Sequence, residues 1–189
     1  MRDAGYAFRV VAPDPAAESG ACSSCGPVEL VRDYALSKAA DVVRQLLAQQ
    51  RNRDILLLAA DTVAECQGQI LGKPANEDHA RRMLELLRGR EHRVHTGVCV
   101  WSLPLTGEPP APYVETVETT LVMDAIDDSA IEEYIESGGW EGKAGGFGYQ
   151  DRLGWIHIKE GSESNVVGLP MERVAELLNE RNIFTEHGP

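Results

Sequence analysis

The spacing of hydrophobic positions along this chain changes several times and predicts a series of distinct elements. Between Val28 and Gln50 apolar residues recur every three or four positions, which predicts an amphipathic helix, and Pro27 suits its first turn. Ile55–Ala60 is instead apolar at every position without a helical period, which predicts a buried strand. The next residue is Asp61, so we expect a carboxylate at the tip of that strand.

Alternating runs, caps and turn residues predict the other elements. Loose alternation over 6–12 indicates a strand, and the runs 62–66 and 69–71 indicate a hairpin around a Gln-Gly turn. Asn76 is expected to cap a helix that stops at Gly89. The remaining expected elements are strands over 91–102, 113–123 and 155–159, a helix from Asp127 or Asp128 to Glu136, and a last helix opened by Pro170.

Alternating strands and helices predict an α/β protein with a mixed sheet, as a single domain over residues 1–189 or as two closely joined lobes. A net charge of −12 argues against binding a nucleic acid polymer, but a local cluster of cations could still hold a nucleotide. No run reaches the ~18 apolar residues of a membrane span. No signal peptide is visible either, so we expect no membrane partner and a cytoplasmic location.

Cysteine and histidine spacing gives little support for a metal centre. Cys22 and Cys25 have CxxC spacing, but without a second pair a turn with incidental thiols is favoured over a zinc site. His92 and His95 are three residues apart in a strand pattern, so their side chains should point to opposite faces. A metal shared by either pair is therefore not expected.

Phosphate chemistry is the alternative that the charged residues suggest. Asp61 is either a turn aspartate that accepts backbone N–H groups or a carboxylate that binds magnesium or takes a proton from water. Lys38 projects about 20° from Val31 on the helix, at the edge of the apolar stripe, from where its amine could face a cleft. Lys73 is either a solvated turn residue or a point charge on phosphate, and Pro74 excludes a Walker A loop.

The densest glycine segment, residues 142–150, carries Lys143 and Gln150. It lacks the GxGxxG pattern, so a dinucleotide fold is not indicated. The segment is either a flexible connector or a backbone that approaches a ligand closely between its two polar side chains. A glutamine amide both donates and accepts hydrogen bonds, which suits recognition of the edge of a base.

Taken together, these segments resemble the Maf family of nucleotide pyrophosphatases, also called septum-formation-inhibitor-like proteins. The resemblance extends over almost the whole chain, and it implies an elongated mixed β-sheet flanked by helices, similar to inosine triphosphate pyrophosphatases and often found as a homodimer. The matching segments are Lys38-Ala39-Ala40, Ala60-Asp61-Thr62-Val63, Ile70-Leu71-Gly72-Lys73-Pro74, Arg82-Met83-Leu84, His92-Arg93-Val94-His95-Thr96-Gly97-Val98, Lys143-Ala144-Gly145-Gly146 with Gln150, and Asn165-Val166-Val167-Gly168-Leu169-Pro170.

The resemblance implies hydrolysis of a nucleoside triphosphate to the monophosphate and pyrophosphate with a divalent cation, Mg²⁺ or Mn²⁺. Asp61 matches the family's proposed proton acceptor, and Asp61 and Glu18 are the expected metal ligands. Thr62 and Gln150 match positions associated with base choice, and Gln150 together with the Asn-Val-Val-Gly-Leu-Pro ending is similar to the dTTP/UTP branch rather than the 7-methyl-GTP branch. The expected substrate-binding residues are Glu18, Lys38, Thr62, Lys73, Lys143 and Gln150.

One part of the family pattern has no counterpart in this sequence. The family begins with a buried strand and a Ser-x-Ser-Pro-Arg-Arg motif, which precede the segment that matches Ala4–Tyr6 and present phosphate-facing side chains at a helix start. Either the start codon is assigned downstream of the true one, or the chain is a truncated homologue that binds nucleotides without hydrolysing them. Loss of the strand also predicts an exposed sheet edge.

Overall fold

The structure, a computed structural model, describes residues 1–18 and 25–185, except for the side chain of Glu18. Its centre is a five-stranded sheet with the strand order β2-β1-β3-β4-β5. All four ladders are antiparallel, and an isolated parallel bridge joins Arg88 to Met123. The strands are β1 (Ile55–Cys66), β2 (Gln69–Leu71), β3 (Glu91–Leu103), β4 (Tyr113–Met123) and β5 (Ile156–Glu160).

Helices flank this sheet, as the sequence predicts. Asn76 caps α2 by accepting a hydrogen bond from the His79 backbone N–H at 2.9 Å, and Asp127 caps α3 by accepting one from Ala130 at 2.8 Å. The α/β class with flanking helices is therefore confirmed. The helices are α1 (Pro27–Leu47), α2 (Glu77–Leu87), α3 (Asp128–Glu136), α4 (Glu163–Val166) and α5 (Met171–Asn179), with short 3₁₀ turns η1 (Pro15–Glu18), η2 (Ala144–Gly146) and η3 (Tyr149–Asp151).

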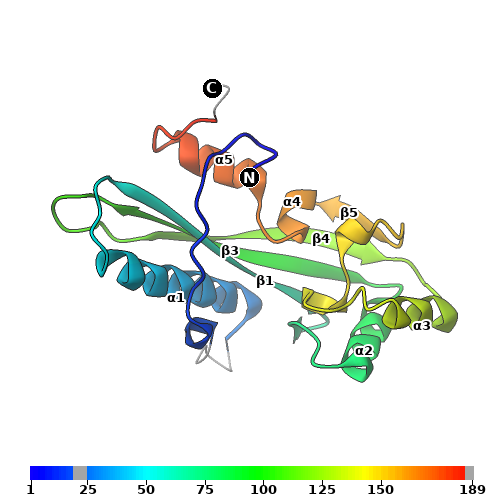
Figure 1. The fold of residues 1–189 in the computed structure, drawn as a ribbon. Helices are drawn as coiled ribbons and strands as arrows, with labels where there is room; N and C mark the ends of the chain where they lie inside the picture. Colours follow the sequence, from blue (N-terminus) through cyan, green and yellow to red (C-terminus); the bar gives the residue numbers. More distant parts are fainter. Residues whose placement is uncertain (19–24, 186–189) are drawn as a thin grey trace.

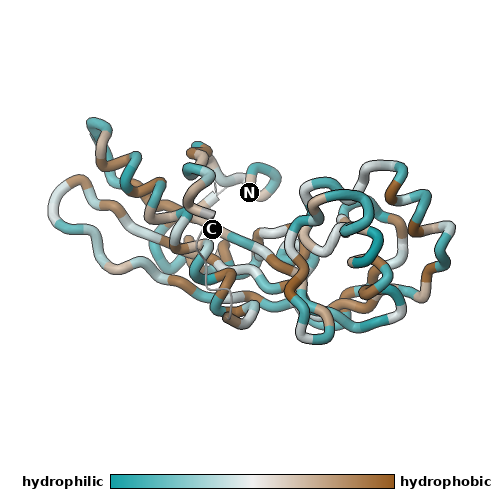
Figure 2. The backbone as a smooth tube through the Cα atoms, turned by 90° about the horizontal axis from the view of Figure 1, so that it is seen from below, coloured by the Kyte–Doolittle hydropathy of each residue, from teal (hydrophilic) through white to brown (hydrophobic). Residues whose placement is uncertain are grey.

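The molecule is elongated along its strands and has two halves (Figures 1 and 2). In one half, α1 packs on one face of the sheet, where Leu57 and Ala39 belong to one hydrophobic cluster. Helix α5 packs on the opposite face, in a second cluster that includes Val98 and Leu177. In the other half, α2 and α3 enclose a separate hydrophobic cluster. A single sheet connects both halves, as an organisation in one domain over 1–189 requires, although the domain assignment itself stays a prediction.

Strand β1 continues past the point where the sequence pattern predicts its end. Asp61 pairs with Gly97 in the middle of the strand, and the ladder with β3 extends to Glu65. The expected position of Asp61 at the tip of a strand is therefore wrong. The first arm of the hairpin around Gln67-Gly68 continues the apolar run as one strand. Because side chains alternate along a strand, those of Asp61 and Thr62 lie on opposite faces of the sheet.

The strand predicted over residues 6–12 is absent. These residues cross the sheet steeply rather than running beside a strand, so their backbone groups cannot join a ladder (Figure 1). Phe8 is 42% exposed and Val10 73% exposed, whereas Tyr6 is buried among α5 side chains. The loose alternation of apolar residues thus belongs to an extended segment that packs through single side chains such as Tyr6, not to a strand.

The outer edge of β1 is open over most of its length. Strand β2 pairs only with Ala64–Cys66, so Ile55–Val63 has no strand partner on that side among the residues that the structure describes. Within the apolar run only Leu57 is buried. Among the described residues, the edge of β1 beside Asp61 therefore carries no ladder on its outer side.

Candidate functional site

The centre of the candidate site is an ion pair between α1 and β1. Helix α1 places the Lys38 ammonium 2.5 Å from Asp61 Oδ1, and the two side chains are 16% and 17% exposed. The predicted position of Lys38 at the edge of the apolar stripe is thus confirmed. The other carboxylate oxygen, Oδ2, accepts no hydrogen bond from any other described residue, so it can take a proton or a cation.

A close approach of two backbones fixes the distance between α1 and β3, the strand that pairs with β1. Gly97 lies directly across from Asp61 in the β1–β3 ladder. A Cβ at Gly97 would lie 2.1 Å from the Val31 carbonyl oxygen and 2.4 Å from the carbonyl carbon, both in α1. Only a glycine fits there, because the atoms that a side chain would meet are backbone atoms.

Thr62 belongs to a different set of contacts on the opposite face of the sheet. Its Oγ1 lies 2.9 Å from Thr96 Oγ1 and 3.5 Å from the carbonyl oxygen of Gly168. Asn165 in α4 is fully buried, and its amide donates to Thr119 Oγ1 at 2.9 Å. These contacts hold α4 and the turn after it on the sheet, so Thr62 does not face the Lys38–Asp61 pair.

Lys73 lies at the open edge of the sheet. It is exposed and follows β2, the edge strand of the described sheet, by two residues. The Gly145 backbone N–H donates to the Gly72 carbonyl at 3.0 Å. The glycine-rich segment is therefore attached beside Lys73 rather than being a flexible connector.

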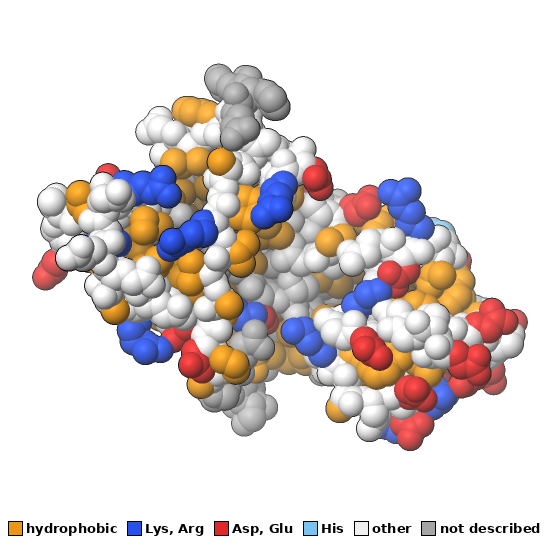
Figure 3. Space-filling model, in the orientation of Figure 1, with side chains coloured by type: hydrophobic (Ala, Val, Ile, Leu, Met, Phe, Trp, Pro, Cys, Tyr) orange, Lys and Arg blue, Asp and Glu red, His pale blue; other side chains and the backbone are white. Residues whose placement is uncertain are grey.

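The other expected site residues are distributed around this edge. Gln150 is exposed in η3, and the Lys143 ammonium contacts Asp151 instead of the Lys38–Asp61 pair. The backbone of Glu18 ends η1, but its side chain lies outside the described residues, so its place beside Asp61 stays a prediction. Figure 3 shows a hollow between the two halves of the molecule, with basic side chains along its margin.

Residues 1–181 match the family model described as Maf-like protein. The chain belongs to the Maf family. Curated relatives include proteins named dTTP/UTP pyrophosphatase from Rhodopirellula baltica, which is 51% identical over 93% of this chain and 73% of its own length, and from Dictyoglomus thermophilum, at 36% identity over 95% and 88%. A third, from Sphingopyxis alaskensis with the same name, is 40% identical over 80% of this chain and 76% of its own length.

The Maf motifs include polar residues whose structural role the sequence analysis missed. Thr96 and Asn165 lie within the matching segments but were given no function, and both are fully buried in the contacts around Thr62. Their positions in otherwise apolar stretches could have indicated this role, because a buried polar side chain needs hydrogen-bond partners.

Neither cysteines nor histidines form a metal centre in the described part of this Maf chain. No group of three or more His, Cys, Asp or Glu side chains there could hold a metal ion, and His92 and His95 lie on opposite faces as predicted. Cys22 lies outside the described residues. Cys25 is disulfide-bonded, so the expectation of an incidental thiol is wrong at that position.

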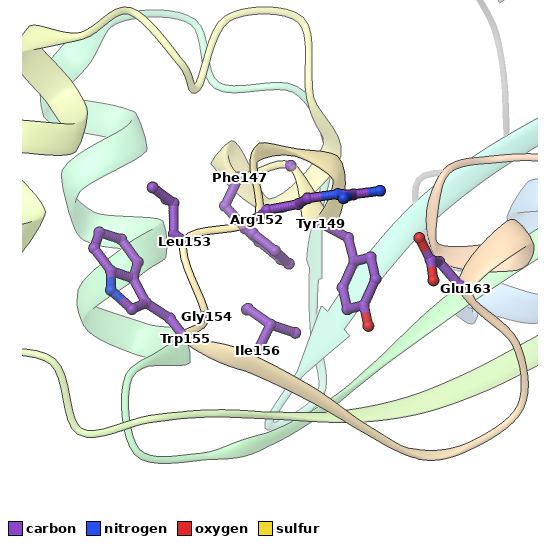
Figure 4. A pocket seen from close by; sticks show the side chains of 9 residues that line it. Phe147, Tyr149, Arg152, Leu153, Gly154, Trp155, Ile156 and Glu163 are labelled. Carbon is purple, nitrogen blue, oxygen red and sulfur yellow. The ribbon is translucent and has the colours of Figure 1, made fainter.

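A pocket of about 280 Å³ opens between the glycine-rich segment and α4 (Figure 4). Phe147, Tyr149 and Ile156 supply apolar surface, while Arg152 and Glu163 supply opposite charges at its rim. Lys38 and Asp61 are not among its lining residues. The pocket is thus separate from the ion pair, although the segment that forms one wall also carries Gln150.

The two buried histidines of β3, His92 and His95, predict that the stability of the fold decreases in acid. Burial lowers the pKa of His92 and of His95, although Glu118 and Glu65 partly oppose this at His95, where Arg93 adds to the lowering. Below about pH 6.5 the unfolded chain binds protons on these imidazoles that the folded chain does not. The free energy of unfolding should therefore decrease as the pH is lowered below this value, by up to about 1.4 kcal/mol per pH unit for each histidine. The decrease ends when the pH reaches the folded-state pKa.

Urea unfolding at pH 7.5, 6.5 and 5.5 would measure this loss. A His157→Gln variant is the control for substitution itself, because the His157 side chain is 59% exposed and the unfolding midpoint at pH 7.5 should stay close to that of the wild type. An unfolding midpoint that stays constant between pH 7.5 and 5.5 would contradict the burial argument.

Proposed function

We propose that this Maf-family chain hydrolyses dTTP and UTP to the nucleoside monophosphate and pyrophosphate. The names of the relatives from Rhodopirellula baltica and Dictyoglomus thermophilum support this substrate choice. The observation that carries the proposal is the partly buried Lys38–Asp61 pair at the open sheet edge. Cleavage of the α–β phosphoanhydride needs a water molecule in line, a proton acceptor and cations on the leaving group, and these residues supply the last two.

In the proposed reaction Asp61 accepts the proton of the attacking water through its carboxylate. Lys38 holds Oδ1 of Asp61 and thereby fixes the orientation of the carboxylate, which leaves Oδ2 for the water or a cation. Lys73 neutralises phosphate oxygens as a point charge from the edge of the sheet. Glu18 is proposed to bind beside Asp61.

Base choice is proposed to depend on Gln150 and Thr62. The Gln150 amide is exposed and can both donate to a pyrimidine carbonyl oxygen and accept from the ring N–H. Thr62 would act indirectly, because its hydroxyl lies against Gly168 and so fixes the turn after α4.

The donor set is compatible with Mg²⁺ or Mn²⁺ as the divalent cation. Such ions are commonly held by one or two carboxylates together with substrate phosphates, rather than by a cage of protein ligands. Asp61 offers an oxygen without a hydrogen bond from the described residues, and Glu18 is the proposed second ligand. When bound, the cation would neutralise phosphate charge.

Purified protein with Mg²⁺ should release pyrophosphate from dTTP and UTP, and faster than from dGTP or 7-methyl-GTP. Pyrophosphate release measured across these nucleotides tests the proposal. Thermal stabilisation by dTTP without any hydrolysis would instead favour the alternative of a non-catalytic, nucleotide-binding protein.

Two further parts of the proposal concern the state of the protein. We propose a homodimer, for which light scattering of the purified chain is the test. No described helix is long and apolar enough to span a membrane, and the cytoplasmic location stays a prediction.

A further inference from the structure

Three side chains form a closely connected cluster beneath the glycine-rich segment. The Lys143 ammonium lies 2.7 and 2.6 Å from the two carboxylate oxygens of Asp151, and the Tyr134 hydroxyl lies 2.7 Å from Asp151 Oδ2. The Gly148 backbone N–H in turn donates to the Tyr134 hydroxyl at 3.2 Å. Tyr134 belongs to α3, so the cluster joins this helix to both ends of the loop.

The protonation states of the cluster fit these contacts. Burial, assisted by the hydrogen bond to Asp151, raises the pKa of Tyr134, so the phenol stays neutral and can donate. Burial alone would raise the pKa of Asp151, but the bonds from Lys143 and Tyr134 outweigh it and hold that pKa below its usual value. Asp151 is therefore a carboxylate at neutral pH and balances the charge of Lys143.

The beginning of the same loop is fixed by different contacts. Gly145 is bonded to the Gly72 carbonyl, and a Cβ on it would lie 3.2 Å from the Ala64 side chain. This attachment does not involve the Lys143 cluster. The part of the loop that depends on the cluster is the second half, where Gln150 directly precedes Asp151.

We propose that Lys143, Asp151 and Tyr134 form a brace that positions Gln150, and that Lys143 is a positioning residue rather than a phosphate ligand. The inference rests on the proposed function, since it concerns how the loop presents Gln150 to a pyrimidine base. Asp151 neutralises the Lys143 ammonium, which is 24% exposed. The stem of Lys143 also lies against Gly148, where a Cβ would be 2.8 Å from Lys143 Cδ, so the side chain is fixed along its length.

The test compares hydrolysis of UTP and CTP by Lys143→Met, Asp151→Asn and the double variant. These two substrates have the same triphosphate and differ only at the edge of the base. If the brace positions Gln150, each single variant should lower the ratio of kcat/KM for UTP to that for CTP by about tenfold, the value of one lost hydrogen bond. The double variant should lower it no further, because both substitutions break one interaction.

A phosphate ligand would behave differently. Lys143→Met would then lower kcat/KM equally for UTP and CTP and leave their ratio unchanged, whereas Asp151→Asn would free the ammonium and preserve or improve both values. That pattern would overturn the proposal. Lys159→Met is the matched control, because Lys159 is a surface lysine that is 57% exposed and paired with Glu91 at 2.7 Å; its ratio should equal that of the wild type.

Hydrogen exchange of the intact protein, measured by mass spectrometry, tests the brace independently of activity. Backbone amides of residues 147–152 should exchange faster in Lys143→Met and Asp151→Asn than in the wild type, while that of Gly145, which donates to the Gly72 carbonyl, keeps its rate. Unchanged exchange across 147–152 would overturn the brace even in an active enzyme. Absence of hydrolysis by the wild type, with faster exchange in the variants, would refute the proposed function and leave the brace standing.

Discussion

Replacement of Asp61 by asparagine is expected to lower kcat for pyrophosphate release from dTTP and UTP by about 10³-fold or more. The amide has nearly the same shape as the carboxylate, so it preserves packing but cannot accept a proton or balance the Lys38 charge. Lys38 Nζ lies 2.5 Å from the carboxylate in the wild type, and both side chains are mostly buried. The loss should therefore appear in catalysis more than in the overall fold.

Asp78→Asn is the matched control for this variant. Asp78 is also a carboxylate paired with a cation, Arg81, but its side chain is 77% exposed on α2. Its replacement should leave kcat within about twofold, as is usual for surface pairs. Circular dichroism and thermal unfolding of both variants verify that they are folded. Equal pyrophosphate release by folded Asp61→Asn and wild-type protein would exclude Asp61 as the proton acceptor.

Replacement of Gly97 by alanine is expected to reduce the free energy of unfolding by about 3 kcal/mol, at the upper end of the range for overpacking. The added Cβ would lie 2.1 Å from the Val31 carbonyl oxygen, and α1 must move away to accommodate it. Because Gly97 is opposite Asp61, this movement would also pull Lys38 away from Asp61. Stability and activity should thus fall together, as urea unfolding and pyrophosphate release would show.

Gly72→Ala provides the control for the stability measurement. No atom lies within 4 Å of a Cβ at that position, and its φ is outside the left-handed region. Its unfolding midpoint should stay close to that of the wild type, within about 0.5 kcal/mol. Equal destabilisation by Gly97→Ala and Gly72→Ala would show that the contact with Val31 does not fix α1.

The regular elements could be predicted from the sequence where one local rule dominated. The period of the apolar positions located α1 from residue 28, one residue after its observed start at Pro27. Asn76 marked the start of α2, and Asp127, one of two candidate caps, marked that of α3, because these side chains accept hydrogen bonds from backbone N–H groups within the same turn. These signals depend on neighbouring residues, so they need no knowledge of the rest of the fold.

The incorrect predictions concern features that depend on distant partners. The continuation of β1 beyond Asp61 depends on pairing with β3, and the absence of a strand over residues 6–12 depends on the path of that segment across the sheet. Neither partner can be read from a short window of sequence. Alternation alone therefore could not distinguish a paired strand from an extended crossing segment.

The site was predictable in part for the same reason. The helical angle of Lys38 placed it at the edge of the apolar stripe, from where it reaches Asp61, because α1 is regular. The catalytic role of Asp61 stays a prediction. The partner of Lys143 was not predicted, because Asp151 is reached through a loop with positive φ angles at Gly145 and Gly146. No sequence periodicity describes such a backbone path.

Because Asp61 and Thr62 lie on opposite faces of one strand, insertions and deletions within β1 are restricted. Insertion or deletion of one residue in β1 before Asp61 would reverse the faces of all later side chains, so the carboxylate would leave Lys38 and the hydroxyl would leave Thr96 at the same time. The ion pair proposed for catalysis and the hydrogen bonds that hold α4 on the sheet would be lost together. Sequence change within β1 is therefore restricted to substitution, whereas length variation has to occur in the loops at either end.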